Sequence, residues 1–469
     1  MNSVWQQFTL YYSPLQECLD NSFIHRLVGL LRAWQKSSFL MQWADTIAAI
    51  LLSLVYIITP FIPNNTTLVG ILLAACVAFW LLITLSDEKE PGNIVGVTPI
   101  HFLVFLYWIA TTISTGFSPV KKAAFADWIN VTLLLMLFPL CVRVLQSKSC
   151  RSWLIAVYLH VSLIVSVYAM NQWHNHVPPL ATWVDPDSSL SKATRVYSYL
   201  GNPNLLAGYI LPAVVLSLMA VFVWRTRVRK ALALTMFLLN TATLILTLSR
   251  GGWIALLVVV IALLVLLNYW WSDFISPFWR TWGLRLIFGS LIGLLLLTIV
   301  LLEPVRERIS SMFAGRGDSS NNVRINVWIS AREMIRAYPL GIGPGHTAFN
   351  KIYPLYQQGP RFSALSAYSI FLEVTVESGF FGLACFLWLL TVIFHTGFMQ
   401  LQRLRKLRSE EGFWLIGAIV AIIGMLAHGT VDTVWYRPSV NTVWWLMVAL
   451  IASYYTPISS DQTPQSEDC

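Results

Sequence analysis

Long apolar runs separated by short polar stretches fill the chain almost from end to end. Twelve of these runs are long enough to cross a bilayer, since a span needs about 20 mostly apolar residues to cross roughly 30 Å of hydrocarbon. They cover residues 44–60, 68–85, 99–116, 124–145, 152–172, 203–224, 230–248, 253–270, 283–302, 370–398, 412–429 and 437–455. Because the runs lack the alternation of β-barrel strands, we expect helices. The pattern predicts an all-α polytopic membrane protein with about 12 transmembrane helices.

One long polar interval, between the ninth and tenth runs, divides the chain. It is expected to form a large, partly helical loop, and the whole chain is then organised as follows. The predicted parts are a cytoplasmic N-terminal segment with an amphipathic surface helix (1–43), spans 1–9 (44–302), a large periplasmic loop (303–369), spans 10–12 (370–455) and a disordered cytoplasmic tail (456–469).

Lysine and arginine are distributed unevenly between alternate connections. An even number of spans places both termini on one side, and short loops rich in Lys and Arg indicate the cytoplasm. We therefore expect both termini in the cytoplasm and the large loop outside the plasma (inner) membrane. The basic residues assigned to the cytoplasmic side are Arg26, Arg32, Lys36, Arg143, Lys148, Arg151, Arg225, Arg227, Arg229, Lys230, Arg280, Arg285, Arg403, Arg405, Lys406 and Arg408.

Composition agrees with this assignment. Hydrophobic residues make up 57% of the chain and charged residues 11%, and the mean hydropathy of +0.65 is far from that of a soluble protein. In a soluble protein a net charge of +9 would suggest nucleic acid. Here much of the excess marks topology and attracts anionic lipid. We expect membrane lipids as partners and no nucleic acid. His174 and His176 alone do not make a metal site, and we expect no metal and no cofactor.

The sharpest local signals lie in the connections on the outer side. Ser249–Trp253 reads S-R-G-G-W, and its Arg250 is either an anchor that snorkels to the interface or a fork for phosphate. An amphipathic helix is predicted to begin near Val323, with Arg324 in its first turn, and to end at Tyr338. The glycines of 341–346 then form either a sharp turn or a cradle of backbone N–H groups for an anion.

Acidic and amide side chains mark three further span ends. Glu373 and Glu377 lie four residues apart on a helix that enters the bilayer, where carboxylates face an interior. These carboxylates either pair with loop arginines to stabilise the fold or take a direct part in the functional site. Before the sixth span, Asn202 is predicted to cap the helix, with Asn204 beside it. In the last outer turn, Asp432 and Arg437 could form a salt bridge, and His428 could join them.

These motifs together resemble the O-antigen ligase and polymerase superfamily, whose members include Wzy-like proteins. The resemblance rests on the twelve spans, the loop after the ninth, the G-N-P-N and S-R-G-G stretches, the R-x-x-x-W-x-x-A-x-x-M and P-L-G-x-G-x-G motifs, and E-S-G-x-x-G-L. Within the superfamily the chain most resembles the cyanobacterial IctB family, which is associated with inorganic carbon accumulation and described as bicarbonate transporters. The resemblance covers about residues 43–455.

The superfamily resemblance implies roles for particular residues. It implies that Arg250 and Arg324 bind the pyrophosphate of a lipid-linked glycan, and a guanidinium fork would equally suit bicarbonate. The family's A-H-N motif, whose His activates the acceptor hydroxyl, reads Ala367-Tyr368-Ser369 here. A phenol has a pKa near 10 against about 6.5 for imidazole, so Tyr368 is a poor base at neutral pH. His346 and Glu377 are the other candidates for proton transfer.

Three functions of different class remain open at this level. The resemblance to the IctB family favours a protein that handles bicarbonate or another small oxyanion at an arginine site on the outer face. The alternative is a glycosyltransferase similar to the O-antigen ligases, acting on a polyprenyl-diphosphate-linked glycan. An inactive relative that binds such a glycan is the third. Transporters bind substrate near the bilayer midplane, whereas the charged residues lie near span ends, which favours the second and third functions.

Overall fold

The computed structural model describes most of the 469-residue chain. The amphipathic helix predicted in the N-terminal segment, near residues 23–36, and nearly all of the predicted tail 456–469 lie outside the described residues. The described ranges are 3–10, 34, 38–63, 66–86, 97–178, 194–301, 303–313, 315–317, 319–358 and 364–456.

Every predicted span corresponds to a helix, and the described ranges contain no strand. Ten of the helices are long and apolar enough to cross a membrane. Of the other two, α19 is apolar but 16 residues long, and α13 has 25 residues, whose side chains are described only in part. The chain is therefore an all-α polytopic membrane protein, as predicted. The twelve helices are α5 (Ala44–Ile58), α6 (Thr66–Ser86), α7 (Pro99–Phe117), α8 (Lys121–Gln146), α9 (Lys148–His174), α10 (Pro203–Val223), α11 (Arg227–Leu246), α12 (Arg250–Trp271), α13 (Pro277–Leu301), α17 (Ile370–Lys406), α18 (Glu411–Gly429) and α19 (Pro438–Ser453).

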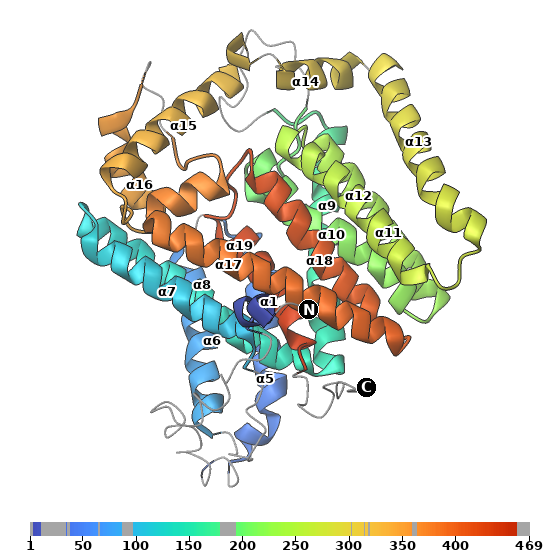
Figure 1. The fold of residues 1–469 in the computed structure, drawn as a ribbon, viewed down its shortest axis with the longest axis horizontal. Coiled ribbons are helices and arrows are strands. Elements are labelled where there is room, and N and C mark those ends of the chain that lie inside the picture. The colour runs from blue at the N-terminus through green and yellow to red at the C-terminus, as the bar shows by residue number, and fades with distance from the viewer. Residues whose placement is uncertain are drawn as a thin grey trace, which may run out of the picture.

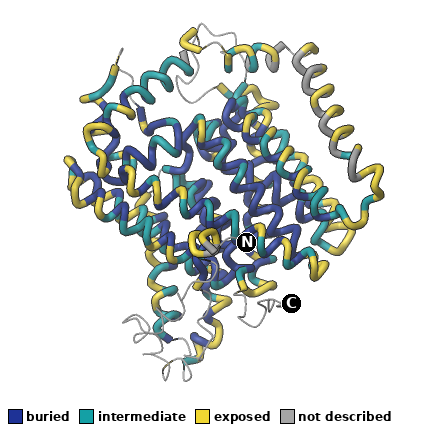
Figure 2. The backbone as a smooth tube through the Cα atoms, in the orientation of Figure 1, coloured by how far each residue is buried: buried dark blue, intermediate teal, exposed yellow. Residues whose placement is uncertain are grey.

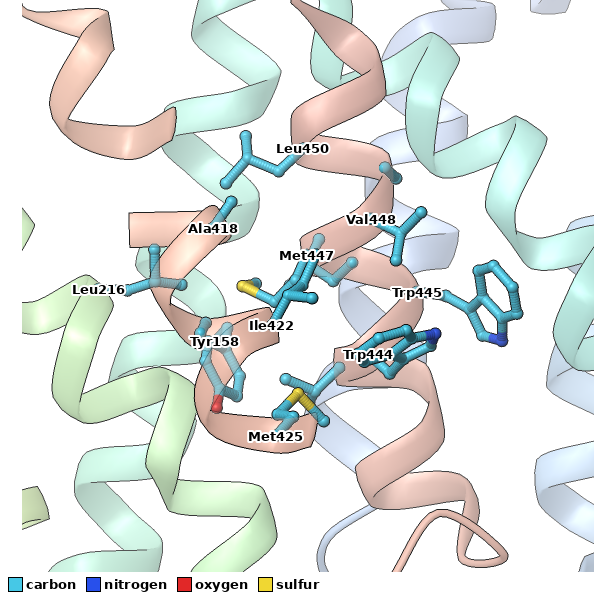
Figure 3. Close-up of a cluster of buried hydrophobic side chains, with 14 of the residues drawn as sticks. Tyr158, Leu216, Ala418, Ile422, Met425, Trp444, Trp445, Met447, Val448 and Leu450 are labelled. Carbon is cyan, nitrogen blue, oxygen red and sulfur yellow. The ribbon is translucent and has the colours of Figure 1, made fainter. Parts of the chain in front are cut away.

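Helices α10 and α18 form the centre of the bundle. In their most apolar windows, 78% of α10 and 83% of α18 is buried, whereas for α6 the share is 22%. Figure 2 shows this buried centre surrounded by helices with exposed outer faces. In Figure 3, side chains of α18 and α19 meet Leu216 of α10 and Tyr158 of α9. A helix that is hydrophobic all round is expected in such a position.

Polar contacts join the helices inside this apolar bundle. On α9, Ser166 donates to Asn240 Oδ1 of α11 over 2.7 Å, the kind of hydrogen bond that links helices in membranes. At one end of the bundle, Arg151 pairs with Glu411, and Arg405 pairs with Asp273. These residues come from the starts of α9 and α18 and the ends of α17 and α12. The alternation of spans requires that these ends meet, but which side of the membrane they face remains a prediction.

The long interval between α13 and α17 folds into helices at the opposite end, called the loop face below (Figure 1). It contains α14 (Glu303–Phe313), the 3-10 turn η4 (Gly315–Gly317), α15 (Ser319–Ala337) and α16 (His346–Tyr356). The predicted amphipathic helix is α15, whose buried side chains Val327, Ala331 and Met334 join a small core with α16 and Ala124 of α8. Figure 1 shows α13 at the margin of the bundle, beside α12 and α14.

Helix α17 bends where it enters the bundle. Gly379 has φ 67° and ψ −172°, which interrupts the 37-residue helix after its first nine residues. Only glycine adopts this conformation readily. The bend sets the segment with Glu373 and Glu377 at an angle to the rest of α17.

Candidate functional site

Arg250 is buried at the loop face rather than anchored at a lipid interface. Ser249 caps α12 by accepting a hydrogen bond from Gly252 N over 3.2 Å, which places Arg250 in the first turn. Its side chain donates from Nη1 to Asn321 Oδ1 of α15 over 2.6 Å, and the residue is 8% exposed. A snorkelling anchor would extend into water, so the anchor interpretation does not fit this arginine.

A glycine next to Arg250 makes room for a histidine. A Cβ added to Gly251 would lie 2.5 Å from Cδ2 of His428, on α18. Within the described residues neither ring nitrogen of His428 has a hydrogen-bond partner, although the side chain is 1% exposed. The S-R-G-G turn therefore lets α12 pack closely on α18 beside the buried imidazole.

Arg324 lies on α15, one turn after Asn321, and pairs with Asp432. The distance from Arg324 Nη2 to Asp432 Oδ2 is 3.2 Å, and the same oxygen accepts a 2.6 Å hydrogen bond from Asn204 Nδ2. The expected salt bridge between Asp432 and Arg437 is wrong, because Arg437 Nη1 donates instead to the carbonyl of Pro63 over 3.0 Å. Arg437 begins α19 and is directed toward the turn between α5 and α6, away from the arginine site.

Both asparagines of the G-N-P-N stretch have defined partners. Asn202 Oδ1 accepts hydrogen bonds from the N–H groups of Asn204 and Leu205, at 2.8 and 3.4 Å, so the predicted N-cap of α10 is confirmed. The side chain of Asn204 reaches Asp432, as described above. The cap therefore holds Asn204 at the loop face, where it supports the carboxylate that pairs with Arg324.

A third arginine, which the sequence did not single out, completes the group. Arg195 donates from Nε to the carbonyl of Thr247 over 3.1 Å and from Nη2 to Asn204 Oδ1 over 3.5 Å. Burial lowers the pKa of Arg195 to about 10, with smaller contributions from Arg250 and Arg324, while Asp432 opposes the shift. At neutral pH Arg195 stays charged. We call Arg195, Arg250 and Arg324 the arginine cluster. Within the described chain, Asp432 is the carboxylate that forms an ion pair with a member of this cluster, Arg324.

Tyr368 lies against the cluster. Its ring centroid is 6.0 Å from the guanidinium carbon of Arg324. Burial, followed by the charge of Asp432, raises the pKa of Tyr368 to about 12, and Arg324 offsets only part of this rise. Arginine proximity therefore does not make this phenol a better base, and Tyr368 is a weaker one than an ordinary tyrosine.

The glycine loop after α15 is a turn and not an anion cradle. Gly343 N donates to the carbonyl of Glu377 and to Ser114 Oγ, both over 3.0 Å. Gly345 N donates over 2.9 Å to the Glu377 carboxylate. These N–H groups are occupied by the protein itself. The loop instead ties α15 and α16 to the first segment of α17, and it places His346 at the start of α16.

Replacing Gly343 by Ala is expected to destabilise the protein. Gly343 has φ +94°, and an added Cβ would lie 2.3 Å from Cβ of Ala124. Strain at such a dihedral costs about 1–3 kcal/mol, and overpacking costs about 1–3 kcal/mol more. Thermal unfolding in detergent measures the effect as a lower Tm. Gly116→Ala on α7 is the control, because an added Cβ there meets nothing within 4 Å. Equal Tm values for the two variants would contradict the prediction.

The two candidate carboxylates are not paired with arginine. Within the described residues neither Glu373 nor Glu377 forms an ion pair, so the pairing interpretation of the sequence does not hold there. The Glu377 carboxylate accepts a hydrogen bond from Gly345 N in the glycine loop. Glu373, which is 6% exposed, lies near enough to Asp432 for their charges to interact. The arginine cluster and these carboxylates therefore adjoin at the loop face.

The fold and this cluster define a polytopic membrane protein with a partly buried group of three arginines at the loop face. Residues 235–387 match the family model for O-antigen ligase. The matched region contains Arg250, Arg324, His346, Tyr368 and both glutamates, whereas Arg195, Asn204 and Asp432 lie outside it. No curated protein matches the chain. The similarity is thus to O-antigen ligases, and the comparisons give no support to the IctB family or to bicarbonate.

Proposed function

We propose that this protein binds the diphosphate of a polyprenyl-linked glycan at the arginine cluster and acts as a glycosyltransferase similar to O-antigen ligases. The observation that carries the proposal is electrostatic. Three guanidinium groups lie close enough for their charges to interact, and Asp432 forms an ion pair with one of them, Arg324. Like charges this close repel each other. An anion with several oxygens lowers that repulsion, and guanidinium forks match the geometry of phosphate oxygens.

The position of the cluster favours a lipid-linked anion over bicarbonate. The arginines come from the connection before α10, the start of α12 and the start of α15, all at the loop face. A polyprenyl diphosphate keeps its tail in the bilayer and its charged group at such a face. A carrier for bicarbonate would hold its substrate near the midplane, on broken helices. We place the loop face in the periplasm of an inner-membrane protein with both termini in the cytoplasm.

Arginine binding also supplies much of the chemistry that transfer requires. An acceptor hydroxyl attacks the anomeric carbon, the bond to the diphosphate breaks, and negative charge develops on the departing diphosphate. Fixed cations aimed at that charge stabilise the transition state. The hydroxyl proton passes to a base, for which His346, Glu377 and Tyr368 are the candidates. With a pKa of about 12, Tyr368 is the least suited to accept it. With a well-stabilised leaving group, a modest base suffices.

Two assays on protein in lipid bilayers test the proposal. Titration calorimetry measures binding of a prenyl-diphosphate-linked oligosaccharide, which we expect to bind. Uptake of labelled bicarbonate into sealed proteoliposomes is expected to equal that of empty vesicles. Bicarbonate uptake without glycan binding would overturn the proposal and support the transporter alternative.

Replacing Arg195 by Gln is expected to weaken this binding roughly ten- to hundredfold, because a hydrogen bond to a charged group contributes about 1.5–3 kcal/mol. The variant tests the one member of the cluster outside the region matched to O-antigen ligase. Arg332→Gln on α15 is the control, since the Arg332 side chain is 64% exposed. Equal affinity in both variants would remove Arg195 from the site.

A further inference from the structure

A group of exposed basic residues lies at the end of the bundle opposite the loop face, where three connections meet. Arg225, after α10, lies 3.9 Å from Glu410, which precedes α18. Arg405, near the end of α17, pairs over 2.6 Å with Asp273, after α12. Figure 1 shows these ends of the helices away from α14, α15 and α16. We define the basic patch as the exposed residues Arg225, Arg227, Arg229, Lys230, Lys406 and Arg408.

Most of the basic patch has no counter-charge. The exposed carboxylates of these connections, Asp273 and Glu410, belong to the two contacts just given. An anion that approaches this end of the bundle therefore meets a surface of positive potential. Within the described residues, no ion pair is formed by Arg227, Arg229, Lys230, Lys406 or Arg408.

Large apolar side chains are exposed between these charges. Val228 separates Arg227 from Arg229, and Leu407 precedes Arg408. Phe274 is exposed in the α12–α13 connection. Basic and apolar side chains mixed at the ends of spans fit the boundary between lipid headgroups and acyl chains. A nucleic acid would match the charge of this surface but not its exposed aliphatic side chains, so the surface favours a lipid.

Arg408 occupies a backbone position that favours glycine. At the end of α17, Ser409 N donates to the carbonyl of Leu404 over 3.0 Å. Arg408 N donates to the carbonyl of Arg405 over the same distance. These bonds form a Schellman motif, whose left-handed residue is usually glycine, yet here it is Arg408 with φ 51°. The arginine costs conformational free energy that glycine would not. Its guanidinium carbon lies 5.3 Å from the ring centroid of Phe274, at the surface.

We propose that the basic patch binds the headgroup of an anionic phospholipid, with Arg408 at the phosphate and with Phe274 and Leu407 against the start of an acyl chain. A guanidinium donates two parallel hydrogen bonds to phosphate oxygens. The site lies at the opposite end of the bundle from the arginine cluster and does not depend on the proposed function. Free phosphate has the same charge but no acyl chain, so the test compares the two.

Thermal unfolding of the purified full-length protein in an uncharged detergent measures this binding, because a ligand of the folded state raises the Tm. The probes are phosphatidylglycerol, phosphatidylcholine and inorganic phosphate. Phosphatidylglycerol is expected to raise the Tm more than phosphatidylcholine does. Equal Tm values with the two lipids would overturn the proposal and leave the charges of the patch as a topology signal alone.

Arg408→Gly separates lipid binding from stability. It removes one charge and the unfavourable backbone conformation together, so without lipid its Tm should equal or exceed that of the wild type, which shows that the variant is folded. Its affinity for phosphatidylglycerol should fall about fivefold, the contribution of one basic residue near an anionic lipid surface. Adding Arg227→Gln and Arg229→Gln should lower the affinity about a hundredfold in total. Unchanged affinity in Arg408→Gly would overturn the proposal.

Two comparisons assign the effect to lipid at this patch. Arg332→Gln removes an exposed arginine at the loop face, and its affinity for phosphatidylglycerol should equal that of the wild type. Inorganic phosphate also reaches the arginine cluster, so any rise in Tm that it causes should be the same in Arg408→Gly and in the wild type. A phosphate-induced rise that Arg408→Gly loses as fully as the lipid-induced rise would identify a site for free phosphate and overturn the lipid as its ligand.

Discussion

Replacing Arg324 by Gln is expected to weaken the binding of a prenyl diphosphate about 30- to 1,000-fold, or about 2–4 kcal/mol. Arg324 pairs with Asp432 through Nη2, and its buried Nε–H has no partner within the described residues. The carboxylate fixes the orientation of the guanidinium, and the Arg324 side chain stays 17% exposed. The substitution removes a charge and a fork together, and it leaves Asp432 with Asn204 as its neutral partner.

Two further variants separate charge from geometry in this prediction. Arg324→Lys keeps the charge but loses the planar fork, so its affinity should lie between those of the wild type and Arg324→Gln. Arg332→Gln removes an exposed charge from the same helix and should bind as the wild type does. Titration calorimetry at two salt concentrations measures all four proteins. An Arg324→Gln variant with unchanged affinity would show that the anion binds elsewhere.

The spans could be predicted from the sequence because each one must satisfy its own backbone hydrogen bonds in lipid. An apolar run of sufficient length then has one outcome, a helix. The cap at Asn202 was also predictable, since it depends on residues adjacent in the chain. The region of α15 was recognisable from its apolar face. These features are local, and the membrane removes most competing structures.

Contacts between distant segments could not be predicted in the same way. Asp432 and Arg437 are neighbours in sequence, but the fold brings Arg324 to Asp432 and directs Arg437 to Pro63. Arg195 is a lone basic residue in a polar connection, with no motif around it. Its place in the cluster follows from its bond to Thr247, just before the S-R-G-G turn. Arg250 and Arg324 were found through resemblance, and their convergence required the packing of α15 on the bundle.

Replacing Asp432 by Asn is expected to change stability and anion binding in opposite directions. Asp432 is 4% exposed, and its carboxylate accepts hydrogen bonds from Arg324 and Asn204. Removing one partner of a buried ion pair costs about 3–5 kcal/mol, because the remaining charge is left uncompensated. Here the remaining charge is that of Arg324, with Arg195 and Arg250 nearby, so the anion-free variant should have a markedly lower Tm. The same loss of negative charge should increase affinity for pyrophosphate.

The two effects are linked through mass action. A ligand that binds the folded state stabilises it by an amount that grows with its concentration relative to Kd, so pyrophosphate should raise the Tm of Asp432→Asn more than that of the wild type. Asp273→Asn serves as the control, because Asp273 is 68% exposed, and an exposed pair contributes about 0–1 kcal/mol. If pyrophosphate leaves the difference in Tm between Asp432→Asn and the wild type unchanged, the cluster does not bind the anion, since an anion at that site must replace the missing carboxylate.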